Sequence, residues 1–246
     1  MTDLISIICV SNNSECLNDF LLKGLKNQTE KYELIVLDNQ NKEFSSAANA
    51  LNEGARRASS DWLVFSHQDI LMESDDVLTV VKKCFKEGLS FFGSSGVKKF
   101  TAKMISNVWT SKHDPKLFAN SNNIRIDRPV KVETLDECFI CMTRDAYNAI
   151  GGFDEVLCDN WHMYGVDASY TAKEKGIDVY AAPLSLLHKS GGRISKAFIH
   201  NLRAMAKKHH LKWIAAPCYH FVNFYPFMWL LWSFWQINYY IDSKRK

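Results

Sequence analysis

The sequence predicts an α/β protein built on a doubly wound sheet. Apolar, strand-like runs alternate with amphipathic helical segments from residue 4 to residue 92. The first three runs end in polar residues, and good helix-capping residues precede the helical segments. A β-α alternation of this kind sets parallel strands side by side through right-handed crossovers.

Four strands are expected in this part of the chain, from β-branched and aromatic runs at 4–10, 33–37, 62–66 and 89–92. The region 94–131 is polar and irregular, which is typical of a lid or acceptor loop. We expect helices at 14–26, 45–58 and 74–87, followed by a strand at 132–143, helices at 144–150 and 167–175, an extended segment at 179–187 and a helix at 195–210.

The stretch 62–69 is the centre of the predicted fold. An apolar strand ends abruptly in the polar triplet His67-Gln68-Asp69. Because α/β sheets bind ligands at the carboxyl ends of their strands, this triplet is placed to face a ligand. Asp69 is an oxygen ligand suited to a divalent cation, and His67 lies on the same face of the strand. The alternative is an ordinary strand followed by a polar loop.

Polar residues also follow the first two strands, and they should line the same crevice. Ser11 and Asn12 end the first strand, and Asp38 and Asn39 end the second. No G-x-G-x-x-G follows the first strand, and no G-x-x-x-x-G-K-[ST] is present, which argues against a dinucleotide fingerprint and a phosphate-binding loop. A nucleotide bound here would need a metal to balance its phosphate charge.

Charge is unevenly distributed along the chain. The 246 residues have a net charge of +3, but residues 193–246 carry nine Lys and Arg against one acidic residue. A basic end on an acidic body indicates an anionic partner, a membrane surface rather than nucleic acid. The seven irregularly spaced cysteines fit free thiols in a reducing cytoplasm, and the first residues show no signal-peptide pattern.

The C-terminal stretch 213–241 has no acidic residue, Lys or Arg and contains four of the seven tryptophans. Polar residues and two prolines interrupt it, so it does not supply the 20 or so apolar residues that a membrane span needs. Ser233, Gln236 and Tyr240 fall on one helical face, which predicts an amphipathic helix in the membrane interface. An aromatic dimer interface and a helix folded onto the body are the alternatives.

Four segments, taken in order, carry a family resemblance. They are 7–13 (IICVSNN), 45–54 (SSAANALNEG), 61–69 (DWLVFSHQD), and 151–155 (GGFDE) together with 165–167 (GVD). In this order they resemble family 2-type glycosyltransferases of the GT-A fold, closest to the bacterial subgroup with His-Gln-Asp in place of Asp-x-Asp. The resemblance covers residues 4–192.

The resemblance implies a doubly wound mixed sheet and a division of the chain. Residues 1–192 would be the GT-A catalytic domain, with a nucleotide-binding half at 1–93 and an acceptor half at 94–192. Residues 193–246 would be a C-terminal helical extension, basic and aromatic.

The resemblance also implies roles for the residues of the crevice. Ser11 lies in the segment that resembles the nucleotide-binding strand, and Asp38 would accept a hydrogen bond from the base, usually uracil. Asn12 and Asn49 would border the same pocket. Asp69 and the late His188 would bind Mn²⁺ or Mg²⁺ against the diphosphate.

Asp167 would be the general base that deprotonates the acceptor hydroxyl, since it stands where relatives carry the last Asp of Gly-Glu-Asp. A helix N-cap is the structural alternative for this residue. The chain departs from the family pattern at two positions. His67 replaces the first Asp of the metal motif, where it is expected to contact the donor, and Val166 replaces the usual Glu.

Four further residues are candidates for sugar or acceptor binding. Asp136 and Glu137 fall where relatives contact the donor sugar. Trp161 is a candidate stacking platform for a sugar, or a core residue. His162 is a candidate acceptor contact or metal ligand, or a core residue.

The resemblance, together with the candidate metal ligand Asp69 and the candidate base Asp167, predicts an inverting, metal-dependent glycosyltransferase. A divalent ion stabilises the nucleoside diphosphate that leaves, and a base activates the acceptor alcohol from the opposite face. We expect a UDP-sugar donor and a glycan or lipid-linked glycan acceptor in bacterial surface polysaccharide synthesis.

Such an enzyme would lie on the cytoplasmic face of the inner membrane and contact it through residues 213–246. The sequence leaves open whether the protein forms a homo-oligomer. The alternatives are a nucleotidyltransferase and a catalytically inert scaffold of a glycan-assembly complex.

Overall fold

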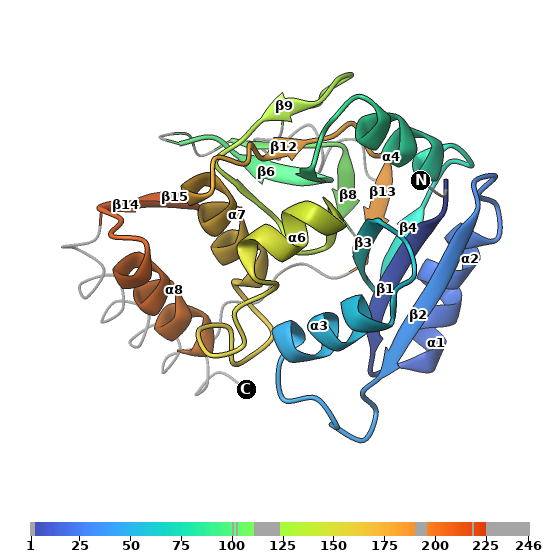
Figure 1. Cartoon of the computed structure of the whole chain (residues 1–246), viewed down its shortest axis with the longest axis horizontal. Coiled ribbons are helices and arrows are strands. Elements are labelled where there is room, and N and C mark those ends of the chain that lie inside the picture. The colour runs from blue at the N-terminus through green and yellow to red at the C-terminus, as the bar shows by residue number, and fades with distance from the viewer. Residues whose placement is uncertain are drawn as a thin grey trace, which may run out of the picture.

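A seven-stranded mixed sheet lies at the centre of the protein (Figure 1). The computed structural model describes residues 3–99, 101, 103–110, 124–189, 196–217 and 219–224. In spatial order the strands are β2 (Tyr32–Asp38), β1 (Ile5–Ser11), β3 (Trp62–His67), β11 (Phe139–Thr143), β5 (Phe91–Gly93), β12 (Tyr180–Ala181) and β9 (Val130–Lys131).

The predicted parallel core is confirmed for the first three strands. β1 pairs in parallel with both β2 and β3. The fourth predicted strand, β5, is not the neighbour of β3, because β11 inserts between them and pairs antiparallel with both. The sheet is therefore mixed, and β12 is parallel to β5 at its far side.

Helices cover both faces of this sheet. One continuous helical segment, formed by α1 (Ser14–Leu17), the π-helical η1 (Asn18–Leu22) and α2 (Lys23–Leu25), packs on one face with α4 (Val77–Lys86). The other face carries α3 (Ala47–Arg57), α6 (Arg144–Ile150) and α7 (Tyr164–Glu174). Strand β1 contributes to both faces because successive side chains of a strand point to opposite sides. Its Ile5, Ile7 and Cys9 pack in the core under α1, α2 and α4, and its Ile8 packs in the core under α3 and α7.

Gly54 lets α3 lie close to the sheet. A Cβ at this position would stand 2.3 Å from Ile8 Cγ2 and 2.9 Å from Leu37 Cδ2. The alanines that precede it in the same helix are also buried. The small-residue pattern at 45–54 is thus explained by close packing of α3 on β1 and β2.

Two small three-stranded sheets lie beside the main sheet. One contains β4 (Ile70–Met72), β13 (Leu186–His188) and β8 (Val108–Thr110). The other contains β10 (Thr134–Leu135), β6 (Ser95–Val97) and β7 (Met104–Ser106). A connection of two residues, 68 and 69, joins β3 to β4 of the first sheet. The pairing of β4 with β13 brings this distant strand to the end of β3.

The C-terminal part differs from the prediction of a helical extension. The helix α8 (Lys196–Lys208) is present, but β14 (Trp213–Ala216) and β15 (Tyr219–Phe224) form an antiparallel hairpin. The prediction of helix is therefore wrong for 213–224, where aromatic and β-branched residues flank Pro217 and favour strands with a turn. The rest of the predicted amphipathic segment, 225–246, lies outside the described residues.

The described C-terminal elements pack on α7 rather than standing apart from the body. α8 and the hairpin lie at the opposite end of the molecule from β2 (Figure 1). Buried residues of α7 and its N-terminal flank meet buried residues of α8 and β14: Met163, Val166 and Tyr170 against Leu202, Met205, Ala206, Ile214 and Ala216.

Among the helices that the structure describes, none is long and apolar enough to cross a membrane.

Candidate active site

A pocket opens at the carboxyl ends of β1 and β3. Residues from both strand ends, from α3 and from the start of α7 form its walls. The lining residues are Val10, Asn12, Ala47, Leu51, Phe65, Ser66, His67, Gln68, Asp69, Trp161 and Tyr164. The location agrees with the expected crevice outside the carboxyl ends of the strands.

His67, Asp69 and His188 converge at one corner of this pocket. Their possible ligand atoms all lie within 4.8 Å of one another. Asp69 Oδ1 is 3.4 Å from His188 Nε2 and 4.0 Å from His67 Nδ1. Two imidazoles and one carboxylate at these distances are a donor set that can hold a divalent transition-metal ion. His67 therefore joins the two predicted ligands in one cluster.

Strand pairing brings the three side chains together. His67 is the last residue of β3, and Asp69 stands in the two-residue connection to β4. In the small sheet His188 is paired with Ile70, the residue after Asp69. The amide of Lys189 also donates to the Asp69 carbonyl oxygen at 3.1 Å, which fixes the end of β13 beside the connection.

The charges of the cluster influence one another. Burial and the neighbouring His188 lower the pKa of the His67 imidazole. Burial alone would lower the pKa of His188 as well, but the hydrogen bond and the charge of Asp69 outweigh burial and raise it. His67 is thus in the neutral form that metal coordination requires at neutral pH.

Gln68, between the two clustered residues, fixes the loop after β1. Its Oε1 accepts from the Ser11 hydroxyl at 2.9 Å and from the amides of Asn12 and Asn13 at 3.2 and 3.1 Å. Its Nε2 donates to Asn12 Oδ1 at 2.7 Å. The Ser11 hydroxyl is therefore directed at Gln68, while Asn12 both lines the pocket and is oriented by Gln68.

Asp38 lies at the same edge of the sheet, two strands away from His67. The register pairs Ser11 with Asp38 and Val10 with His67, so the ends of β2, β1 and β3 lie side by side. The Asp38 carboxylate is exposed, and it accepts from the Gln40 amide at 2.9 Å. An exposed carboxylate can accept a further hydrogen bond from a ligand.

Asn49 does not line the pocket, because its side chain points to the Gly-Gly-Phe-Asp-Glu segment. Its Nδ2 donates to Glu155 Oε2 at 2.8 Å. Asn52, one turn further along α3, donates to Glu155 Oε1 and to the Phe153 carbonyl, and it accepts from Tyr147. These two asparagines hold 153–155 against α3.

Asp136 and Glu137 occupy different environments. Asp136 is half-buried and accepts from the Cys138 amide at 2.9 Å. Glu137 is 7% exposed, and its Oε1 is buried without a hydrogen-bond partner among the described residues. Burial and the nearby Asp136 raise the pKa of Glu137 to about 8, although the amides of Gly165 and Met163 hydrogen-bond to it and oppose this shift. Glu137 therefore contacts the start of α7.

Trp161 and His162 precede α7. Trp161 is 42% exposed although it lines the pocket, so its ring is available to a ligand. His162 is half-buried, and burial lowers its pKa. The exposed ring of Trp161 excludes the alternative of a core residue.

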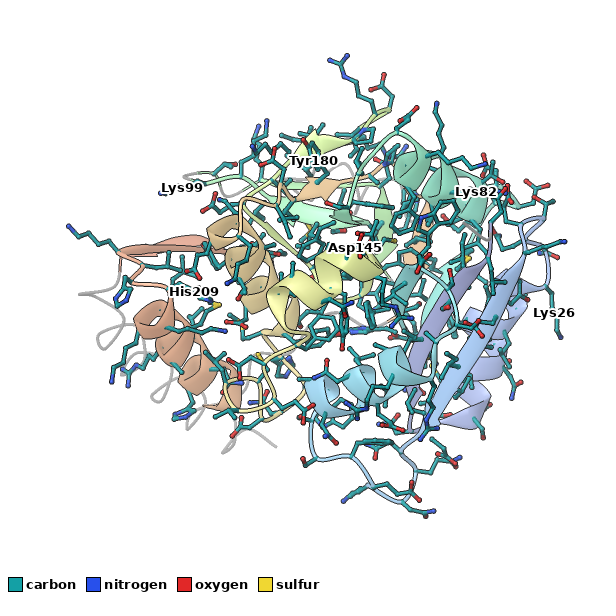
Figure 2. All side chains as sticks on the ribbon, in the orientation of Figure 1. Lys26, Lys82, Lys99, Asp145, Tyr180 and His209 are labelled. Atoms are coloured by element: carbon teal, nitrogen blue, oxygen red, sulfur yellow. The ribbon has the colours of Figure 1, made fainter. Side chains whose placement is uncertain are left out.

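Asp167 lies in the first turn of α7, and Met163 rather than Asp167 precedes the helix. The Asp167 carboxylate is 2% exposed. Lys208 Nζ lies 2.9 and 2.8 Å from its two oxygens, and His209 Nε2 lies 2.7 Å from Oδ1. His209 also contacts Glu174 at 2.7 Å, so it bridges two residues of α7. Figure 2 shows His209 between the ribbons of α7 and α8.

A second, polar pocket reaches Asp167. It is lined by Asn52, 150–155, Asp167, Thr171 and Lys208. Because α3 and α7 contribute to both pockets, the two lie on the same pair of helices. Asp167 is thus reached through a pocket other than the one that holds His67 and Asp69.

Sequence reasoning assigned no individual role to four residues that organise these sites. Gln68 and Tyr164 carried a weak signal, because both stand beside predicted site residues and have side chains that donate and accept hydrogen bonds. Lys208 and His209 gave no such signal, because the sequence predicts that they lie at the exposed end of a basic helix. Their contacts with Asp167 span 41 and 42 positions of the chain.

Comparison with known proteins identifies the family. A family model described as "Glycosyltransferase like family" matches residues 6–192. The chain belongs to this family. A curated relative, "ATP synthase subunits region ORF 6" of Fuscovulum blasticum, is 24% identical over 199 residues, which are 79% of this chain and 77% of the relative.

Solved glycosyltransferase structures share the fold. GalNAc-T7 with UDP, GalNAc and Mn²⁺ superposes with a TM-score of 0.59 at 13% identity, over 83% of this chain and 47% of that one. The mannosyltransferase PcManGT from Pyrobaculum calidifontis with GDP-Man and Mn²⁺ gives 0.54 at 17% identity, over 92% and 68%. S. aureus TarS 1-349 with UDP-GlcNAc gives 0.57 at 12% identity, over 84% and 66%.

These similarities confirm the predicted GT-A fold. The chain spans about half the length of the GalNAc-T7 chain that it matches.

Replacing Gln68 by Met should weaken binding of UDP, the nucleotide expected for this pocket from the sequence, by about 5- to 30-fold, the equivalent of about 1–2 kcal/mol. The reason is that the loop carrying Asn12 loses the hydrogen bonds that Gln68 makes. Calorimetric titration with UDP measures the effect.

Gln28→Met is the matched control. Gln28 also joins separate segments, donating to the Gly24 and Ser74 carbonyls and accepting from the Leu78 amide, but it does not line the pocket. Equal losses of UDP affinity in both variants would contradict a specific role for Gln68.

Proposed function

We propose that the protein transfers a sugar from a UDP-sugar to a glycan or lipid-linked glycan, with inversion at the anomeric carbon and with Mn²⁺ as cofactor. The observation that carries the proposal is the row of strand ends at one sheet edge. An exposed carboxylate, Asp38, stands at one end of the row, and the His67, Asp69 and His188 cluster stands at the other.

A nucleoside diphosphate lying across the end of β1 suits this row. Adjacent strands are about 4.8 Å apart, so the ends of β2 and β3 are separated by roughly 10 Å. Asp38 would accept from the base, uracil having an N–H donor for it. Asn12, oriented by Gln68, would contact the nucleotide between the two ends.

His67, Asp69 and His188 are the residues that would hold the cation. When bound, a divalent cation acts there as a Lewis acid that neutralises charge on the departing diphosphate. Mg²⁺ prefers oxygen ligands, so two imidazoles in the cluster argue against Mg²⁺ and for a transition-metal ion such as Mn²⁺. The structural relatives GalNAc-T7 and PcManGT, whose structures contain Mn²⁺, are consistent with this choice.

Asp167 is proposed as the base that takes the proton of the acceptor hydroxyl. The polar pocket that reaches it gives an acceptor a route to the carboxylate. Lys208 must yield one oxygen of Asp167 when the acceptor binds, because both oxygens are now within hydrogen-bond distance of its ammonium group. Trp161 would stack on a sugar ring at the first pocket.

One observation favours a catalytically inert scaffold as the second candidate. Asp167 is buried and paired with Lys208 and His209, which is also the arrangement of a structural ion-pair network.

A panel of nucleotide sugars should identify the donor. Incubated with Mn²⁺, the protein should slowly release UDP from one UDP-sugar, and EDTA should abolish the release because the leaving diphosphate loses its counter-charge. Mn²⁺ should support faster release than Mg²⁺. Measurement of free UDP gives the rate.

Asp69→Asn should remove most of this UDP release, whereas Asp75→Asn, an exposed carboxylate on the following loop, should not. UDP release that survives EDTA would contradict the metal-dependent mechanism. Silence with every donor, together with no nucleotide binding by calorimetry, would favour the scaffold.

Asp167→Asn should lower the transfer rate by about 10²- to 10⁴-fold, because the amide cannot accept the acceptor proton. The dissociation constant of UDP should not change, since Asp167 does not line the donor pocket. Lys208→Met is the control, because it breaks the same ion pair but leaves the carboxylate. Equal rate losses in the two variants would assign the effect to the ion pair and remove Asp167 from the chemistry.

We also propose that residues 213–246 contact an anionic membrane, on the evidence of their aromatic side chains and of the basic tail 244–246. The full chain should co-sediment with vesicles that contain an acidic phospholipid, and less so at high salt. A chain that ends at Phe224 should stay in the supernatant. This end point is chosen because it keeps the hairpin that packs on α7. Co-sedimentation of the shortened chain would refute the role of 225–246.

A further inference from the structure

Tyr164 joins the candidate metal cluster to the start of α7. It is the first residue of that helix, and it is 3% exposed. Its hydroxyl oxygen lies 3.0 Å from His67 Nε2 and donates to the Glu137 carbonyl oxygen at 3.1 Å. The hydroxyl therefore stands between a histidine of the cluster and a backbone acceptor.

The hydroxyl has one proton, and this determines the direction of both hydrogen bonds. A carbonyl oxygen can only accept, so the contact with Glu137 requires Tyr164 to donate its proton there. The contact with His67 then requires Nε2 to carry a proton and donate to the hydroxyl oxygen. In the neutral imidazole only one nitrogen is protonated, so Nδ1 keeps its lone pair.

The free lone pair points into the cluster. Nδ1 is the His67 nitrogen on the Asp69 side, at 4.0 Å from Oδ1. This distance is too long for a hydrogen bond, so a proton on Nδ1 would have no hydrogen bond to Asp69, whereas a proton on Nε2 has one to Tyr164. The same atom is well placed to share one cation with Asp69 and His188.

Packing fixes the position of the Tyr164 ring. The ring meets Phe153 edge-to-face with centroids 5.3 Å apart. The start of α7 is held by the Glu137 carboxyl group, to which the amides of Met163 and Gly165 hydrogen-bond. Gly165 permits this approach, because a Cβ there would lie 2.9 Å from Glu137 Cγ. The hydroxyl is thus held in place before any ligand binds.

We propose that Tyr164 is a positioning residue of the metal site, which selects the His67 tautomer with a free Nδ1 and orients the ring toward Asp69 and His188. The inference rests on the proposed function, since it assigns a purpose to the same cluster. Partners that orient a metal-binding histidine through its second nitrogen typically change metal affinity by 10- to 100-fold when they are removed.

Tyr164→Phe should therefore weaken Mn²⁺ binding to the whole protein by about 10- to 100-fold. Titration with Mn²⁺, followed by the electron paramagnetic resonance signal of the free ion, measures the dissociation constant without any sugar donor. Tyr170→Phe is the control: it removes another buried hydroxyl of α7, which accepts from the Ala215 amide away from the cluster. This control should bind Mn²⁺ like the wild type.

A double-mutant cycle tests whether the effect passes through His67. Tyr164→Phe should cost no further Mn²⁺ affinity in a His67→Ala background, because the residue that it orients is gone. Full additivity of the two losses would overturn the inference. The ¹⁵N spectrum of the metal-free wild type gives an independent readout, and it should show His67 protonated at Nε2. A spectrum with the proton at Nδ1 would also overturn it.

The outcomes separate this inference from the proposed function. Equal Mn²⁺ affinity in the wild type and in Tyr164→Phe would refute the role of Tyr164 and leave the metal site intact. Absence of Mn²⁺ binding to the wild type would refute both.

Discussion

The two-residue connection from β3 to β4 is the constraint on which the candidate site depends. His67 ends β3 in the main sheet and Ile70 begins β4 in a small sheet, so only Gln68 and Asp69 lie between them. His67, Gln68 and Asp69 all lie at the carboxyl edge of the main sheet, because the chain leaves that sheet for the small one at these residues. The pairing of β4 with β13 then supplies His188 from far along the chain, and the cluster would not exist without it.

Helix α7 links the two pockets mechanically. Tyr164 and Asp167 are three residues apart, so they lie one turn apart on the same side of the helix. The first contacts the metal cluster, and the second pairs with Lys208 and His209 of the C-terminal part. The start of the same helix is held by Glu137, to which the amides of Met163 and Gly165 hydrogen-bond. One helix therefore positions residues of both pockets.

The interpretation of single segments was correct where local pattern decides structure. The strands β1, β2 and β3 and the helices α3, α4 and α6 occur close to the predicted positions, since apolar periodicity and capping residues act over a few neighbours. The interpretation was wrong at 213–224, where hairpin pairing and contacts with Thr134 and Tyr170 outweigh helical periodicity. It also missed that β11 would insert beside β3, because antiparallel insertion leaves no local mark.

By itself the sequence determined the alternation of strands and helices, the polar strand ends and the candidate metal ligand Asp69, because these follow from side-chain chemistry and spacing within each segment. His188 became a candidate only through the family resemblance. Only the tertiary structure decided that His67 joins these two, that Tyr164 holds His67, and that Asp167 is paired with Lys208. The reason is that such contacts join segments distant in the chain, and the burial of surfaces between segments determines which ones meet.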